Sequence, residues 1–408
     1  MTPPDISTTV AGVSLSTCLY NASGPRSGTS TVLHKLAANP NTGAVLSKSA
    51  TIAAQTGNPQ PRTFHVEQNG MNVASFNSEG LPNKGIDYYI ANETIDEIYD
   101  GLSTDKKPTN KPYIVSLSGK TLDDNLEMIQ RIAKANASTQ PPRIAAIELN
   151  LACPNIIGKP IVAYDVPQMK DILQKVRQCV QKYRDTLPPL GVKLAPYLDF
   201  NQLAAVAELL NDYTDVVRYV VTINTVGNAL CLDVHAQHPC IASNAGLAGL
   251  SGPAVHYTAL ANVRQLRQLL DAAVDIVGVG GVSTGEQAAA MLMVGAAAVQ
   301  VGTAHWKEGP ACFDRIADEL KVYMQQHGFA NLSELQKSFH LWTKDGAQAS
   351  REYKKQHLQQ QIATSASTLA DKGAFGNLWT VSLAVLAIVL LADKLGVFSS
   401  LSLWWYWY

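Results

Sequence analysis

Strand-length runs of apolar and β-branched residues recur along most of this chain, and they restrict the folds that it can adopt. The runs are continuously apolar rather than alternating, which is typical of parallel strands covered on both faces. Helical patterns lie between most of them. This alternation fits a (β/α)₈ barrel, the TIM barrel of the α/β class, better than an open doubly wound sheet. The runs are Leu19–Ala22, Ala44–Lys48, Tyr113–Ser118, Ile144–Leu151, Gly191–Leu194, Tyr219–Asn224, Asp275–Gly280 and Ala297–Gly302.

Two regions depart from the repeat and define the expected organisation of the chain. Residues 50–112 are too long for a simple crossover and contain the turn-rich sequences GNPQPR and NSEGLPN. We expect them to form an elaborated loop or subdomain over the face at the carboxyl ends of the strands. After Phe339 the chain becomes polar and then strongly apolar. We therefore expect a barrel at 1–339, a polar linker at 340–376 and a hydrophobic C-terminal tail at 377–408.

The tail predicts a membrane anchor. Residues 378–392 read LWTVSLAVLAIVLLA, which as a helix would be about 22 Å long, short of the roughly 30 Å hydrocarbon core. Continuing past Asp393-Lys394 to Leu403 would span it, and the final WWYWY resembles an interfacial aromatic belt. We expect this anchor to hold a cytoplasmic catalytic body at a membrane. A buried helix that caps the barrel is the alternative.

Composition excludes several classes of function. Lys and Arg number 32 and Asp and Glu 33, so the chain lacks the basic footprint of a nucleic-acid-binding protein. Its six cysteines form no CxxC pair, which argues against a disulfide scaffold, a zinc site or an iron–sulfur site. The N-terminal segment has no secretory pattern. We therefore expect a reducing compartment and no metal.

Amides, two lysines, one cysteine and several glycines stand at the carboxyl ends of the predicted strands, where barrels of this kind place their chemistry. The absence of a carboxylate pair among these residues disfavours a glycosidase. The absence of a set of His and Asp ligands disfavours a metal-dependent hydrolase. The residues at the strand ends include Asn21-Ala22-Ser23, Lys48-Ser49, Asn150–Asn155, Lys193, Asn224-Thr225, Gly280-Gly281 and Gly302-Thr303.

Three of these features have both a functional and a structural interpretation. The pair Gly280-Gly281 after strand seven and Gly302 after strand eight, with Gly252, predict backbone amides around the phosphate of a cofactor such as FMN, although glycines also simply end strands. Lys193 has one structural interpretation, as a barrel-interior lysine paired to a carboxylate. It has two functional ones, as a Schiff-base lysine or as a lysine that stabilises a reduced flavin. Cys153 is an inert small residue or, given its polar loop, a base or nucleophile.

The body of the chain, from about Val13 to Lys337, resembles dihydroorotate dehydrogenase of class 1A, the homodimeric type that uses fumarate. The cysteine in the CPN sequence is typical of class 1, because the membrane-bound class 2 enzymes have serine as that base. The matching sequences are collinear: NASG at Asn21, SKS at Ser47, GNPQPR at Gly57, NSEGLPN at Asn77, ELNLACPN at Glu148, GKPIVAYD at Gly158, GVKLAPY at Gly191, TALANVR at Thr258 and VGTAHWKEGPACFDRI at Val301.

The resemblance implies an FMN-dependent oxidation of (S)-dihydroorotate to orotate in pyrimidine (UMP) biosynthesis. Cys153 would remove the C5 proton while a hydride passes from C6 to N5 of the flavin, and fumarate would accept the electrons. Residues implied to hold FMN are Ala22, Ser23, Lys48, Ser49, Asn150, Lys193, Ile223, Gly252, Gly280, Gly281, Gly302 and Thr303. Those implied to hold dihydroorotate are Lys48, Asn77, Ser78, Glu79, Gly80, Leu81, Asn150, Asn155, Asn224 and Thr225.

Several residues depart from the class 1A pattern and keep alternatives open. Ala152 replaces a serine, Thr225 replaces another, the HVEQNGMNVASF segment before Asn77 is longer, and AGLSGP is closer to class 2. One alternative is a membrane-tethered barrel that binds a flavin or pyrimidine without turnover. Another is a dihydroorotate dehydrogenase reoxidised by quinone. A related enzyme that oxidises another dihydropyrimidine is a third, although such enzymes carry iron–sulfur cysteines that this chain lacks.

Overall fold

A computed structural model describes residues 2–100, 111–152, 161–348, 351–353, 355, 356 and 359. Contacts between residues divide the chain into two compact units, Met1–Phe339 and His340–Tyr408. The first unit contains the barrel and the small sheets beside it. Cys153 and Asn155, and the predicted anchor at 377–408, lie outside the described residues. In the described part of the chain, no helix is both long and apolar enough to cross a membrane.

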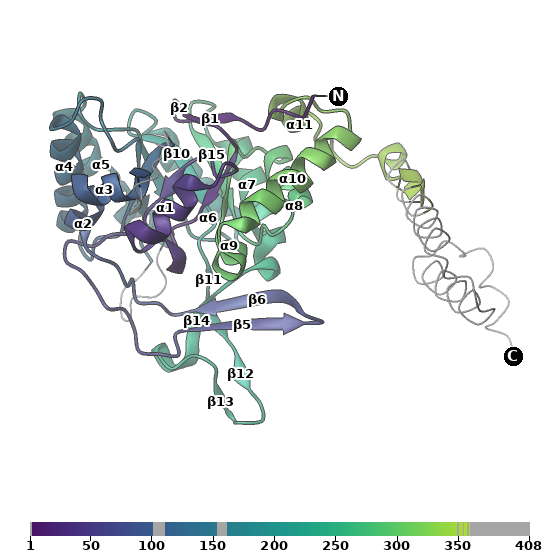
Figure 1. Cartoon of the computed structure of the whole chain (residues 1–408), viewed down its shortest axis with the longest axis horizontal. Helices are drawn as coiled ribbons and strands as arrows, with labels where there is room; N and C mark the ends of the chain where they lie inside the picture. The colour runs from purple at the N-terminus through teal and green to yellow at the C-terminus, as the bar shows by residue number, and fades with distance from the viewer. Residues whose placement is uncertain are drawn as a thin grey trace, which may run out of the picture. The chain divides into compact units, whose positions relative to one another are not determined.

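Eight parallel strands form the main sheet, as the apolar runs predict (Figure 1). Each strand lies within or overlaps one of those runs, and the strand order along the sheet is β3-β16-β15-β10-β9-β8-β7-β4. The prediction of a TIM barrel is therefore confirmed. The strands are β3 (Leu19–Asn21), β4 (Val45–Leu46), β7 (Tyr113–Leu117), β8 (Ala146–Asn150), β9 (Leu190–Lys193), β10 (Val217–Thr222), β15 (Asp275–Val279) and β16 (Ala298–Val301).

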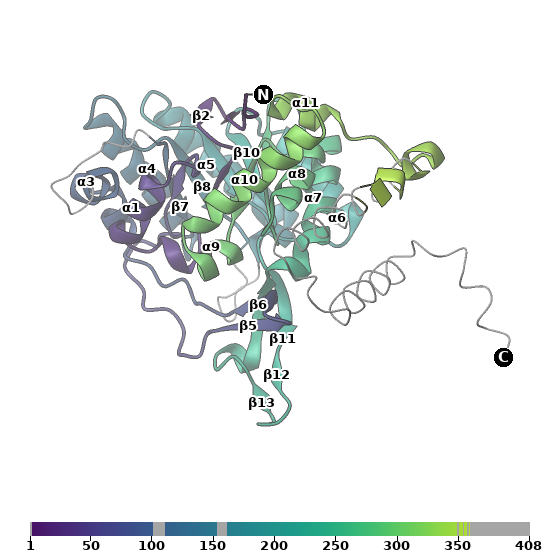
Figure 2. The same ribbon diagram turned by 45° about the vertical axis from the view of Figure 1, so that its right-hand side comes forward.

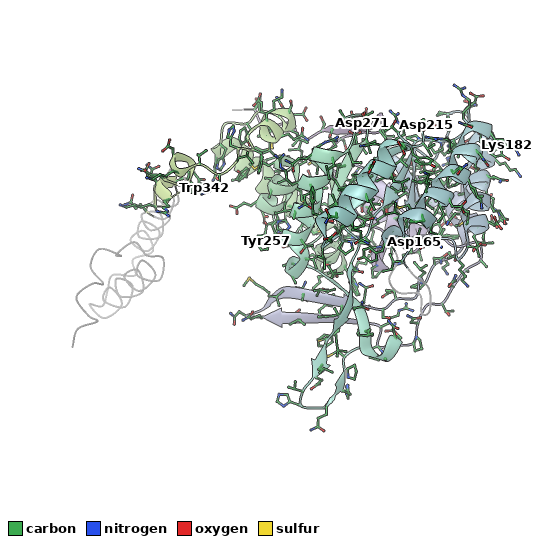
Figure 3. The ribbon with its side chains drawn as sticks, turned by 180° about the vertical axis from the view of Figure 1, so that it is seen from behind. Asp165, Lys182, Asp215, Tyr257, Asp271 and Trp342 are labelled. Carbon is green, nitrogen blue, oxygen red and sulfur yellow. The ribbon has the colours of Figure 1, made fainter. Side chains whose placement is uncertain are left out.

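Helices surround this sheet and bury one apolar face each against it (Figures 1 and 2). Side-chain caps help to fix where they begin: Thr121 and Thr284 form capping boxes with Asp124 and Gln287. In α5, Asp165 caps the N-terminus and Lys182 lies in the last turn (Figure 3), the charges that the helix dipole favours. The longer helices are α1 (Ser30–Ala38), α3 (Asn92–Asp100), α4 (Leu122–Ala137), α5 (Val166–Lys182), α6 (Phe200–Asn211), α7 (His256–Leu269), α8 (Gly285–Met293) and α10 (Ala311–Gln326).

Large polar side chains fill part of the barrel interior. Tyr20, Glu148, Tyr219 and Gln300 are all at most 2% exposed and come from four different strands. The Tyr219 ring lies over Gly191, where a β-carbon would approach the ring to 2.4 Å. Glycine at this position of β9 is therefore what gives the tyrosine room inside the barrel.

The seam between β3 and β4, the two ends of the strand order, is closed by a side chain. The Asn21 amide donates to the Leu46 carbonyl at 2.7 Å, and its oxygen accepts from the Leu46 N–H at 2.9 Å. Asn21 is fully buried. It thus supplies both hydrogen bonds that a neighbouring strand would otherwise give to Leu46.

A four-stranded antiparallel sheet lies beside the barrel, with the order β11-β14-β6-β5 (Figure 1). Strands β5 (Thr63–Gln68) and β6 (Met71–Asn77) come from the elaborated region that the sequence predicts. Strands β11 (Val226–Leu230) and β14 (Leu247–Ser251) come from the segment after the sixth barrel strand, where sequence patterns gave no sign of a sheet. The predicted subdomain is therefore built from two separate segments of the chain, one before β7 and one after β10.

Replacing Asn21 by leucine should lower the free energy of unfolding of the barrel. The change leaves the buried N–H and C=O of Leu46 without partners, each at a cost of about 1–3 kcal/mol. We expect a loss of about 2 kcal/mol or more, measured by denaturant unfolding of the full chain. Asn201→Leu, at an exposed position of α6, is the control and should change the value by no more than about 0.5 kcal/mol. Equal effects of the two changes would contradict the role assigned to Asn21.

Candidate active site

A cavity of about 650 Å³ opens at the carboxyl ends of the barrel strands, between them and the four-stranded sheet. Every residue that the family resemblance assigns to FMN lines this cavity. They come from seven of the eight strand ends and from the segment after β14. The residues are Ala22, Ser23, Lys48, Ser49, Asn150, Lys193, Ile223, Gly252, Gly280, Gly281, Gly302 and Thr303.

Most of the residues assigned to the substrate lie in the same wall. Asn77, Glu79 and Leu81 line the cavity from the end of β6 and the loop after it, and Asn224 and Thr225 line it after β10. Ser78 and Gly80 do not: Ser78 is fully buried behind the wall, and Gly80 is packed against Asn58. The positions of Cys153 and Asn155 lie outside the described residues.

Glycine backbone forms one end of the cavity. Gly281 has a φ of +70°, and a β-carbon there would lie 2.7 Å from the carbonyl oxygen of Gly252. Gly280, with a φ of +137°, would bring a β-carbon within 2.6 Å of the Ala259 methyl group. Both positions require glycine, so the loops after β14 and β15 approach each other through bare backbone. Such a cradle suits a phosphate group.

Hydrogen bonds connect the polar side chains of neighbouring strand ends. The Ser23 and Ser49 hydroxyls are 3.0 Å apart, and the Asn150 amide donates to Ser49 at 3.4 Å. The Asn224 amide donates to the Asn150 oxygen at 3.3 Å and to the Ala152 carbonyl at 2.8 Å. These contacts hold both amides in place at the cavity wall.

Lys193 lines the cavity and also faces a carboxylate inside the barrel. Its ammonium nitrogen is 3.9 Å from Glu148 Oε1, and both side chains are buried. The Gln300 amide donates to the other Glu148 oxygen at 2.6 Å. Burial raises the pKa of Glu148, and the charge of Lys193 and the Gln300 hydrogen bond oppose that rise. The carboxylate-paired interpretation of Lys193 therefore agrees with the structure, and the same side chain also lies in the cavity wall.

The loop that carries Asn77, Glu79 and Leu81 is braced by the GNPQPR sequence. Arg62 Nε is 3.4 Å from Glu79 Oε2, and its guanidinium donates to the Thr56 carbonyl at 2.8 Å. Gly57, with a φ of +79°, allows this approach, since a β-carbon would lie 2.5 Å from the Glu79 carbonyl. The guanidinium therefore balances the only carboxylate that this loop brings to the cavity.

The Thr225 hydroxyl is buried and has no hydrogen-bond partner within the described residues. It lies beside Gly249, where a β-carbon would come within 2.1 Å of the hydroxyl oxygen. A buried hydroxyl without a partner at a cavity wall is suited to a polar ligand group.

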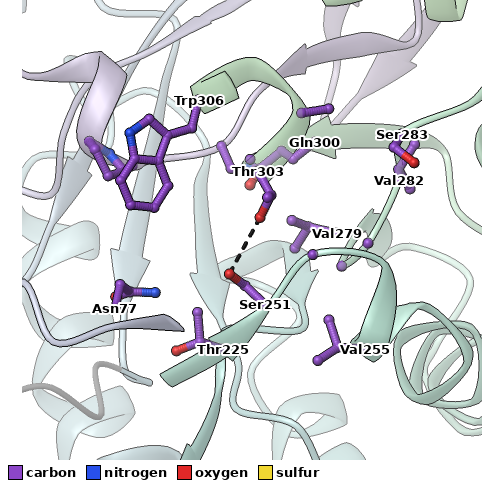
Figure 4. Close-up of a pocket in the computed structure, with 18 of the residues that line it drawn as sticks. Asn77, Thr225, Ser251, Val255, Val279, Val282, Ser283, Gln300, Thr303 and Trp306 are labelled. Carbon is purple, nitrogen blue, oxygen red and sulfur yellow. Dashed lines mark hydrogen bonds between the residues drawn. The ribbon is translucent and has the colours of Figure 1, made fainter. Parts of the chain in front are cut away.

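The β5–β6 hairpin and α9 (Thr303–Glu308) add a wall that sequence reasoning missed. The rings of His65 and Trp306 meet at 4.5 Å, and Lys307 forms an ion pair with Glu67. In Figure 4, Trp306 lies on the same side of the cavity as Asn77, while Thr303 and Ser251 form a hydrogen bond. The only sequence feature that points to this wall is the long HVEQNGMNVASF segment before Asn77. Lining residues that were not predicted include Met71, Asn72, Val73, Ser251, Val282, Gln300, Trp306 and Arg315.

Taken together, the fold and the site define a TIM-barrel protein with a stretch of glycine backbone, two lysines and a cluster of amides in one cavity. Within the described ranges, no group of His, Cys, Asp or Glu residues could hold a metal ion. A protein-family model described as dihydroorotate dehydrogenase matches residues 5–324. The chain belongs to the dihydroorotate dehydrogenase family.

Curated relatives agree over most of the chain. The dihydroorotate dehydrogenase (fumarate) of Kluyveromyces lactis is 39% identical over 316 residues, which cover 78% of this chain and 92% of the relative. Dihydroorotate dehydrogenase A (fumarate) of Lactococcus lactis is 36% identical over 329 residues, or 81% and 97%. The ligand-free DHODH of Eimeria tenella superposes with a TM-score of 0.67 at 20% identity, over 83% of this chain and 93% of that structure, which confirms the fold.

Proposed function

We propose that this chain is a dihydroorotate dehydrogenase that oxidises dihydroorotate to orotate with bound FMN. The observation that carries the proposal is that the residues assigned to FMN, scattered from Ala22 to Thr303, meet in one cavity. Relatives that bear the name dihydroorotate dehydrogenase (fumarate) support the same reaction. It is the oxidation step of pyrimidine synthesis.

The cavity fits FMN in three respects. Gly252, Gly280 and Gly281 line one end of the cavity with backbone that carries no side chains, as a phosphate site requires. Lys193 brings a cation to the cavity wall, where it would favour negative charge on the reduced ring. The volume of about 650 Å³ is within the range of cofactor and ligand pockets. Bound FMN would supply the hydride acceptor, at its N5 atom.

The protein would bind and orient dihydroorotate through amides, because asparagine offers both donors and acceptors to a ring with carbonyl and N–H groups. Asn77, Asn150 and Asn224 all line the cavity. Lys48, also in the wall and only 7% exposed, would pair with the substrate carboxylate. The Thr225 hydroxyl would gain the partner that it lacks within the described residues.

Cys153 would act as the base that removes the C5 proton of the substrate. It directly follows Ala152, whose N–H donates to the Asn150 oxygen at 3.1 Å and whose carbonyl accepts from Asn224 at 2.8 Å. The two amides assigned to the substrate thus hold the backbone of Ala152, the residue directly before Cys153. These hydrogen bonds use the backbone of Ala152, so they do not depend on the serine hydroxyl that is missing here.

We further propose fumarate as the electron acceptor, a homodimer as the assembly, and the predicted membrane attachment of a cytoplasmic barrel through residues 377–408. The curated relatives named for fumarate support the first of these. Quinone is the alternative acceptor, because the apolar tail and the class 2-like AGLSGP sequence are features that favour it.

Gly281→Ala should prevent FMN retention. A β-carbon at this position would collide with the Gly252 carbonyl oxygen. The backbone here also has a positive φ, which alanine disfavours. Gly24→Ala is the control, because it lines the same cavity but its β-carbon would lie 3.7 Å from the nearest atom. The FMN content of the purified proteins, read from the flavin absorbance, should be lost in the first variant and kept in the second. Full FMN content in Gly281→Ala would contradict the cradle.

Cys153→Ala should slow flavin reduction by dihydroorotate by a factor of about 10²–10⁴, the usual contribution of a general base. FMN should stay bound, because the cysteine is not assigned to the cofactor. Stopped-flow absorbance under anaerobic conditions measures the rate, and Cys179→Ala, at a buried position of α5, is the matched control. An unchanged rate in the Cys153 variant would remove this residue from the mechanism.

Reoxidation of the reduced enzyme distinguishes the acceptors. Mixing the dihydroorotate-reduced full chain with fumarate should restore the flavin absorbance and release succinate. A water-soluble quinone at the same concentration should reoxidise the flavin more slowly. Rapid reoxidation by quinone with none by fumarate would overturn the fumarate assignment and leave the dihydroorotate half-reaction standing.

A further inference from the structure

Cys231 and Cys240 form a pair of facing thiols that the proposed reaction does not use. They flank a hairpin made of β12 (Leu232–Asp233) and β13 (His238–Pro239), which projects away from the barrel (Figures 1 and 2). In this hairpin Leu232 lies opposite Pro239 and Asp233 opposite His238. Continuing the same antiparallel register by one residue places Cys231 opposite Cys240.

Backbone geometry confirms that the two cysteines face each other. The Cys240 N–H donates to the Cys231 carbonyl at 2.9 Å. Residues directly opposite in an antiparallel pair have Cα atoms about 4.5–5.5 Å apart, which is inside the range of about 4.4–6.8 Å that a disulfide needs. Burial, and then a hydrogen bond to the Cys240 thiol, raise the pKa of Cys231 to about 11. The two thiols are therefore in contact.

Accessibility separates this pair from the other cysteines that the structure describes. Cys231 and Cys240 are partly exposed, whereas Cys18, Cys179 and Cys312 are buried. Cys231 also packs against the small core of the four-stranded sheet, formed by Phe76, Ile241 and Ala248. A pair of partly exposed cysteines thus lies at the junction between that sheet and the projecting hairpin.

We propose that Cys231 and Cys240 are a reversible disulfide site, oxidised by a low-molecular-weight disulfide such as oxidised glutathione. The Cys240 thiolate attacks a sulfur of the oxidant first, because the raised pKa of Cys231 keeps that thiol protonated, and it forms a mixed disulfide and releases one glutathione thiolate. The second cysteine thiolate then attacks the protein sulfur of that mixed disulfide and releases the other. The S–S bond of the oxidant breaks, one forms in the protein, and the two cysteine protons end on the two glutathione molecules.

The disulfide would link the segment that follows β11 to the segment that precedes β14, and the far ends of these two strands line the cavity. Residue Thr225 directly precedes β11, and Ser251 ends β14; both line the cavity, and the two cysteines lie between these strands in the sequence. A covalent link at this junction would slow local opening of the hairpin and of the strand pair next to it. Thiol oxidation would thereby stiffen one wall of the cavity without changing any residue in it.

Peptide mapping of the oxidised full chain tests the site. Cleavage before aspartate releases residues 215–232 and 233–270, and each fragment contains a single cysteine. After treatment with oxidised glutathione and alkylation of the remaining thiols, the two fragments should be recovered as one linked species that separates on reduction. Fragments that each carry glutathione or the alkyl label instead would overturn the proposal.

Single variants and hydrogen exchange complete the test. Cys231→Ser should trap glutathione on Cys240 as a stable mixed disulfide, and Cys179→Ser should leave the link unchanged. In the linked protein, amide exchange across residues 226–251 should be at least several-fold slower than in the reduced protein. Equal exchange in the two forms would contradict the stiffening. These readouts need neither bound flavin nor turnover, so their failure is distinct from a failure of the proposed reaction.

Discussion

The closure of eight parallel strands is the constraint on which the rest of this molecule depends, and the Asn21 side chain completes it. Strands β3 and β4 are the two ends of the sheet order, and the buried Asn21 amide makes both hydrogen bonds to the Leu46 backbone across that seam. A closed barrel brings the carboxyl ends of all strands to one face. Without closure, Ser23 and Ser49 would not meet at 3.0 Å.

The barrel interior is connected to the cavity above it. Gly191 makes room for Tyr219, and the adjacent polar layer holds Glu148 and Gln300 beneath Lys193. A charged residue this deeply buried is costly unless it is paired. The interior carboxylate and the lysine at the cavity wall are thus best understood as one unit, which keeps a cation at the place where the proposed flavin would carry negative charge.

Much of the fold and of the site could be predicted because the signals are local. Continuous apolar runs marked the barrel strands, and residues such as Lys48, Asn150 and Thr303 stand at the ends of these strands or within two residues of them. Strands β11 and β14 escaped prediction because they are short, partly exposed and rich in glycine and alanine, which gives no clear alternation. The contact between His65 and Trp306 joins residues 241 positions apart, which no local pattern reveals. The pairing of Cys231 with Cys240 likewise depends on the register of a hairpin that only the structure shows.

The central claim is that this barrel holds FMN and oxidises dihydroorotate, and an anaerobic titration of the purified full chain tests it most directly. Dihydroorotate is added in small portions while the flavin absorbance is followed and orotate is measured in the same samples. The account predicts a yellow protein whose flavin band is bleached by one equivalent of dihydroorotate, with one orotate formed per FMN. A colourless protein, or a flavin band that persists in excess dihydroorotate, would contradict it.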